Sequence, residues 1–125
     1  MTQFFLVFTG GAIGSVGRWQ IGRWMTALFG PGFPYGTLAA NVIGGFAMGI
    51  VVATLTRLTV PVDNLRLFLA TGVLGGFTTF STFSLDTVTM IQRGDLATAL
   101  GYASVSVIGS MLALFAGLYL VRALA

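Results

Sequence analysis

The sequence predicts an all-α membrane protein with four transmembrane helices per subunit, a third helix broken near mid-membrane, and an antiparallel, dual-topology homodimer. Composition is the first observation behind this prediction, because 56% of the 125 residues are apolar and only 7% are charged. A soluble domain carries about 25% charged residues to keep its surface in water. The mean hydropathy of +0.96 points the same way. Membrane lipid must therefore cover most of the surface, which excludes a cytosolic enzyme and a disordered chain.

The residue types that most catalytic and metal sites need are missing. The chain has no Cys and no His, so the usual zinc, haem and copper ligands and the His-dependent nucleophile pairs are absent. Only three carboxylates remain, and we predict that the protein is not an enzyme. The isoelectric point near 10.2 arises from six Arg against three Asp. No basic patch accompanies these charges, so we expect no nucleic-acid partner.

Four apolar stretches provide the spans, since crossing a bilayer takes about 20 mostly apolar residues. They cover residues 4–28, 35–56, 67–91 and 96–121. Glycine and proline break the chain in the first link, and polar residues with one proline fill the second. The three links are residues 30–34, 57–66 and 92–95. None of them can hold a domain, so we expect one membrane domain, residues 1–125, whose function lies within the bilayer.

The distribution of arginines gives these spans no preferred orientation. On the side of the N-terminus lie Arg57, Arg66 and Arg122, and toward the opposite side lie Arg18, Arg23 and Arg93. Positively charged loops normally stay in the cytoplasm, and this even division removes the bias. We therefore expect insertion in both orientations and assembly into an antiparallel homodimer with its two-fold axis in the membrane plane. The alternative is a single orientation that folding selects.

Polar side chains inside the spans are costly, so their positions carry information. In the second span Thr37 and Asn41 are four residues apart and share one helical stripe. The Asn41 amide offers two N–H donors and an acceptor oxygen. The alternative for Asn41 is a hydrogen bond that only links neighbouring helices.

The fourth span contains a column of hydroxyl groups. Tyr102, Ser106 and Ser110 follow one another at a spacing of four residues, which extends over about 12 Å of helix. Such a column can present a row of donors to an anion. The alternative is that each serine bonds back to a carbonyl in its own helix.

The third span contains the segment least suited to a helix. Gly75 and Gly76 are followed closely by Thr78 and Thr79, and both residue types have low helix propensity. A break here frees backbone groups that must find partners inside the membrane. Inward-turned carbonyls can bind a cation such as Na⁺, which as a hard ion suits oxygen ligands.

Aromatic and hydroxyl residues alternate after the predicted break. Phe80 and Phe83 are three residues apart and share one face, as do Ser81 and Ser84. For the two phenylalanines, the alternative is contact with lipid or ordinary helix packing.

One known family shares this part of the sequence. Residues 75–84 read Gly-Gly-Phe-Thr-Thr-Phe-Ser-Thr-Phe-Ser, and this run strongly resembles the signature of the Fluc fluoride channels, also called the CrcB family. The resemblance extends over essentially the whole chain, including a glycine-rich N-terminal stretch with Arg18 and the position of Asn41. It implies a passive, highly selective fluoride channel of the bacterial inner membrane. It also implies an antiparallel homodimer with two pores lined by both subunits.

The resemblance also implies roles for individual residues. Backbone carbonyls of Gly75 and Thr78 would hold a structural Na⁺ at the dimer centre, and Arg18 would lie in a vestibule. The pore and its fluoride-binding lining would comprise Asn41, Phe80, Phe83, Ser81, Thr82, Thr37, Tyr102, Ser106 and Ser110. One position departs from the family pattern, because Asp86 stands where a glutamate is usual. The alternative for Asp86 is a charge near the membrane interface that pairs with an arginine.

A lining of neutral donors suits fluoride, which is small and strongly hydrated. A channel must replace the water around its ion without trapping the ion, and amide and hydroxyl groups bind less tightly than a fixed arginine deep in the pore. The edge of a phenyl ring is positive, so Phe80 and Phe83 can point ring edges at an anion. Arg18 can raise the anion concentration at a vestibule; the alternative is an arginine that reaches to the membrane interface.

Other small membrane proteins fit the sequence less well. A dual-topology drug/proton antiporter needs an intramembrane carboxylate in its first span, whereas no acid precedes Asp63 and the chain has no Glu. A cation channel would need a ring of acidic side chains. A non-transporting membrane subunit would explain the glycines but would leave the polar stripes without a use.

Overall fold

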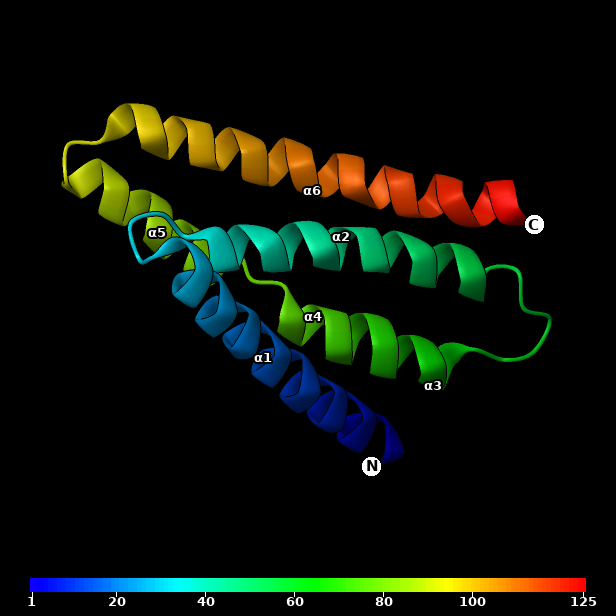
Figure 1. Ribbon diagram of the computed structural model, residues 1–125. Coiled ribbons are helices and arrows are strands. Elements are labelled where there is room, and N and C mark those ends of the chain that lie inside the picture. The colour runs from blue at the N-terminus through cyan, green and yellow to red at the C-terminus, as the bar shows by residue number, and fades with distance from the viewer.

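The computed structural model describes residues 1–125, and its regular structure is entirely helical. The elements in chain order are α1 (Thr2–Phe29), α2 (Tyr35–Leu55), α3 (Asp63–Arg66), the π-helix η1 (Leu67–Leu74), α4 (Gly75–Phe77), α5 (Ser81–Gln92) and α6 (Leu96–Leu124). The passages α1, α2, α3–α5 and α6 run in alternate directions, and both termini lie at the same end of the molecule (Figure 1). Because the chain crosses the molecule an even number of times, the two termini lie at the same end.

The observed helix ends agree closely with the predicted ones, with one exception. Gly30 and Gly94 have positive φ angles of 79° and 81°, so the first and third links turn at residues that tolerate this backbone conformation. The second link was predicted to extend to Arg66, and this prediction is wrong, because α3 already begins at Asp63. Asp63 lies in the first turn of α3, where a negative charge favours the start of a helix.

The surface of the molecule is that of a multi-pass membrane protein. Three helical stretches are long and apolar enough to cross a bilayer, namely Tyr35–Leu55, Asp63–Gln92 and Leu96–Leu124. The predicted first span coincides with α1, whose 28 residues include Arg18 and Arg23. This helix is long enough to cross a bilayer but is less apolar than the other three stretches. Only 14 of the 125 residues are buried, whereas many large apolar side chains are exposed. Such a surface requires an apolar environment.

The third passage is interrupted between Phe77 and Ser81. Helix α4 ends at Phe77, and Thr78 has extended backbone angles of φ −83° and ψ 159°. Helix α5 begins three residues later, at Ser81. The interruption follows directly on the paired glycines, as residues with low helix propensity favour. It turns the chain, so that α5 continues in a different direction from α4 (Figure 1).

Glycines bring α1 unusually close to the third passage. A Cβ atom added at Gly10 would lie 2.6 Å from the carbonyl oxygen of Phe68, and one added at Gly76 would lie 2.6 Å from that of Gly11. At Gly14 the added atom would collide with the carbonyl group of Val73. Small residues at this spacing allow backbones to approach closely inside a membrane. This packing fixes α4 against α1 and thereby positions the interruption.

We expect Gly14→Ala to destabilise the fold by about 2 kcal/mol or more, because an added methyl group in a closely packed contact forces the backbones apart. The measurement is the thermal unfolding of the purified variant in detergent. Gly11→Ala is the matched control, since an added Cβ there has no atom within 4 Å. Equal unfolding temperatures for the two variants would show that the α1 contact does not stabilise the protein.

Candidate functional site

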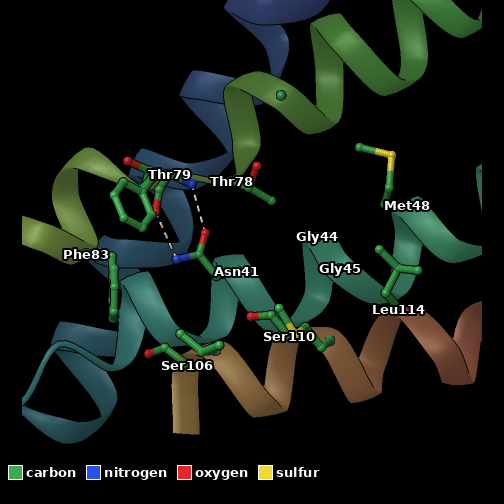
Figure 2. Close-up of a pocket in the computed structure, with 14 residues that line it drawn as sticks. Asn41, Gly44, Gly45, Met48, Thr78, Thr79, Phe83, Ser106, Ser110 and Leu114 are labelled. Carbon is green, nitrogen blue, oxygen red and sulfur yellow. Dashed lines mark hydrogen bonds between the residues drawn. The ribbon is translucent and has the colours of Figure 1, made fainter. Parts of the chain in front are cut away.

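The main candidate site is an open cavity of about 630 Å³ between α2, α6 and the interrupted passage. Seven of the predicted site residues line it, namely Asn41, Gly75, Thr78, Phe80, Phe83, Ser106 and Ser110. The remaining walls are mostly small or apolar and include Gly44, Gly45, Met48 and Leu114 (Figure 2). The tight α2–α6 packing creates this wall, because a Cβ at Gly45 would meet the Ser110 carbonyl oxygen at 2.7 Å. The cavity thus combines an apolar surface with a few neutral polar groups.

Asn41 holds the interrupted segment in place. Its Oδ1 accepts a hydrogen bond from the backbone N–H of Thr79 at 2.8 Å, and its Nδ2 donates to the carbonyl of the same residue at 3.0 Å. Figure 2 shows the side chain rising from α2 to meet this peptide backbone from below. The contact is the interhelical hydrogen bonding considered as the alternative for Asn41. One N–H of the amide takes no part in these two bonds and can serve as a donor to a ligand.

The two phenylalanines of the α5 start form an aromatic row with Tyr102. The ring centroids of Phe80 and Phe83 are 5.7 Å apart, and those of Phe83 and Tyr102 are 5.4 Å apart. Phe80 is 78% exposed, whereas Tyr102 is fully buried in the small core with Met90 and Ala99. The Tyr102 hydroxyl donates to Oδ2 of Asp86 at 3.0 Å, so this carboxylate has a phenol as its partner rather than an arginine.

The serine column of α6 does not bond back to its own helix. The Ser106 hydroxyl is buried and has no hydrogen-bond partner at all, and Ser110 lines the same cavity. In α5, by contrast, the hydroxyl of Thr87 donates to the Phe83 carbonyl four residues before it. A buried hydroxyl without a partner is costly unless a ligand or water completes it. Ser106 lines the main cavity, and its hydroxyl is a donor that no group of the protein uses.

The carbonyls of Gly75 and Thr78 fit a hard cation. Both residues line the main cavity, and none of the backbone hydrogen bonds around the interruption uses either carbonyl. The N–H of Thr79, which would bond to Gly75 in a continuous helix, donates to Asn41 instead. Neutral oxygen donors of this kind suit hard cations. The residues present could therefore hold the expected Na⁺.

A second cavity, of about 600 Å³, adjoins the first passage. It contains Arg18, Thr37 and Thr82, together with Trp19 and Arg23. The structure thus separates three of the predicted site residues from the main cavity. Arg23 lies over the Trp19 ring at 5.0 Å, while the Nε of Arg18 donates to the Gly76 carbonyl at 3.3 Å. Two cationic side chains make this cavity attractive to anions.

Some site features could not be found in the sequence, and two predicted site residues, Ser81 and Tyr102, line neither cavity. The Ser81 hydroxyl lies 3.3 Å from that of Thr79. From the sequence, Thr79 is expected only as part of the predicted break and not as a site residue, although its hydroxyl also accepts a hydrogen bond from the N–H of Thr82. Its place next to the two glycines was a signal for the break, but its partner Asn41 is 38 residues away. The pairing of Asp86 with Tyr102 could not be predicted either, because the two residues are 16 positions apart.

Comparison with known proteins places these features in a family. Residues 5–118 match the family model described as CrcB-like protein, Camphor Resistance (CrcB). A protein of Agrobacterium fabrum named "Fluoride-specific ion channel FluC" is 51% identical over 122 residues, or 98% of both chains. A protein of Rhizobium etli with the same name is 51% identical over 124 residues, or 99% of both chains. An Anaeromyxobacter protein, also so named, is 48% identical over 126 residues, covering 100% of this chain and 99% of its own.

Proposed function

The chain belongs to the CrcB family, and from this premise we propose that it is a passive, fluoride-selective channel of the bacterial inner membrane that exports fluoride. Relatives at about half identity over their whole length are named fluoride-specific ion channels. The structural observation that supports the proposal best is the buried, unpartnered hydroxyl of Ser106 in the main cavity. It offers a neutral donor where a dehydrated anion needs one, and a neutral donor does not trap the ion.

The walls of the cavity account for selectivity. Phe80 and Phe83 lie at the cavity with ring centroids 5.7 Å apart. Their positive edges can face an anion, and an apolar bore between them would be too narrow for a larger halide. Thr37 and Thr82, in the second cavity with Arg18, provide further neutral donors on the side where anions would gather. The phenylalanine edges and the threonine hydroxyls together offer successive weak binding sites for the anion, which is what rapid conduction requires.

The assembly that we propose has four spans per subunit and two copies in opposite orientations, with two pores that both subunits line. The division of arginines, three against three, supports it. So does the open form of the main cavity, where Phe80 is 78% exposed in a single subunit. A second copy would cover this aromatic side chain and close the groove into a pore. In this arrangement the interruption of the third passage lies near the middle of the membrane.

A structural Na⁺ at the dimer centre is part of the proposal. The free carbonyls of Gly75 and Thr78 in each subunit would hold it. The ion would supply permanent positive charge near the pores, in a lining that otherwise consists of neutral groups. It would also satisfy carbonyls that membrane lipid cannot hydrogen-bond. An antiporter is not favoured, because no acid precedes Asp63 and the chain has no Glu.

Purified protein in liposomes loaded with fluoride should release fluoride rapidly down its gradient, and should release chloride at less than about a hundredth of that rate, because the closed groove replaces hydration only for the smaller anion. The measurement uses ion-selective electrodes after the membrane potential is short-circuited with a potassium ionophore. Protein-free liposomes provide the background. Equal release of the two anions, or fluoride release that requires a proton gradient, would contradict the proposed channel.

A further inference from the structure

Arg18 reaches the end of α4 from the neighbouring helix α1. Its Nε donates to the carbonyl of Gly76 at 3.3 Å, and the side chain is half-buried. Helix α4 ends at Phe77, and the next residue, Thr78, has an extended backbone. No backbone N–H donates to the Gly76 carbonyl, so the guanidinium is its hydrogen-bond donor. An exposed helix end inside an apolar environment needs such a partner.

The packing of α1 brings Arg18 to this place. Gly10, Gly14 and Arg18 are spaced by four residues and lie on one stripe of the helix. The two glycines hold α1 against the backbone of the third passage at Phe68 and Val73. Arg18 is one turn further along, and its side chain therefore meets α4 where that helix stops.

The second arginine of the same cavity provides a contrast. Arg23 is exposed, stacks on the ring of Trp19 at 5.0 Å, and makes no hydrogen bond to the backbone. The two residues carry the same charge into the same cavity. They differ in that only Arg18 donates a hydrogen bond to the backbone of α4, just before the interruption.

We propose that Arg18 is a positioning residue that caps the C-terminal end of α4 and holds the segment 78–80 that links α4 to α5, and that it affects ion flux through this hydrogen bond more than through its charge. The inference rests on the proposed function, because the segment that Arg18 holds lines the main cavity, through which fluoride is proposed to pass. A cationic side chain suits the last carbonyls of a helix. With Asn41 bonded to Thr79 from α2, the interruption is fixed from two helices.

Two substitutions of Arg18 separate the hydrogen bond from the charge. The Nε of arginine and the amide nitrogen of glutamine are the same number of bonds from Cα, so Arg18→Gln keeps a donor at the required position and removes the charge. Arg18→Lys keeps the charge but has a methylene group at that position. We expect Arg18→Lys to lower fluoride flux about tenfold, as loss of a hydrogen bond from a charged donor predicts, and Arg18→Gln to lower it less. Thermal unfolding should follow the same order.

Arg23→Gln is the control for charge alone. Its effect on flux should disappear at high ionic strength, which screens exposed charges, whereas the deficit of Arg18→Lys should persist. Higher flux in Arg18→Lys than in Arg18→Gln, wild-type flux in both, or failure of Arg18→Gln to fold would each overturn the inference. If the wild type itself carries no fluoride, the proposed function fails, while the order of unfolding temperatures still tests the cap.

Discussion

Replacement of Phe83 by isoleucine is expected to reduce fluoride efflux by about tenfold, because an aliphatic side chain has no positive edge to offer a dehydrated anion. The ring lies between those of Phe80 and Tyr102, so its loss interrupts the aromatic row at its middle. Phe80→Ile should also reduce efflux, since Phe80 lies at the exposed end of the row. The measurement is initial fluoride efflux from liposomes at equal protein density.

The proposed dimer should remain intact in both variants, which size-exclusion chromatography in detergent can check. Phe115→Ile is the matched control, because Phe115 is 67% exposed on α6 and does not line the main cavity. Efflux equal to that of the wild type in both Phe80→Ile and Phe83→Ile would remove these residues from the ion path.

Replacement of Asn41 by leucine should have the larger effect, namely loss of fluoride flux by about a hundredfold or more. The leucine leaves the N–H and the carbonyl of Thr79 without the partners that Asn41 supplies. Each unsatisfied group costs about 1–3 kcal/mol. The segment 78–80 is expected to shift, and with it the start of α5.

Asn41→Asp distinguishes the two bonds. The aspartate can still accept from the Thr79 N–H but repels the carbonyl, and its negative charge opposes an anion. We therefore expect low flux in this variant with a smaller loss of thermal stability than in Asn41→Leu. Ile43→Leu on the exposed side of the same helix is the control. Normal flux in Asn41→Leu would show that neither the backbone contact nor the amide is needed.

The apolar stretches and the position of the interruption could be predicted because they depend on local properties. Composition requires a lipid environment, and two glycines next to two threonines weaken a helix wherever they occur. The spacing of Ser106 and Ser110 likewise places them on one stripe of α6, and both line the main cavity. These inferences need only the period of a helix.

Other features depend on contacts between distant segments. The bonds of Asn41 to Thr79 and of Arg18 to Gly76 join residues 38 and 58 positions apart, and both amide and guanidinium groups have several plausible partners in any sequence. The division of the polar residues between two cavities, with Thr37 and Thr82 beside Arg18, follows from how α1 and α2 pack. The short helix α3 was missed because Pro61 stands just before it and because its own Asp63 and Asn64 are typical of a loop.

The small interior of one subunit bears on how the protein behaves at low abundance. With only 14 of 125 residues buried, an isolated copy keeps few contacts of its own. In the assembly proposed above, much of the free energy of folding resides in contacts between copies, and mass action then governs how much folded protein exists. Dilution in the bilayer would reduce the activity of each copy. Fluoride export would therefore fall more steeply than the number of copies when a cell makes little of the protein.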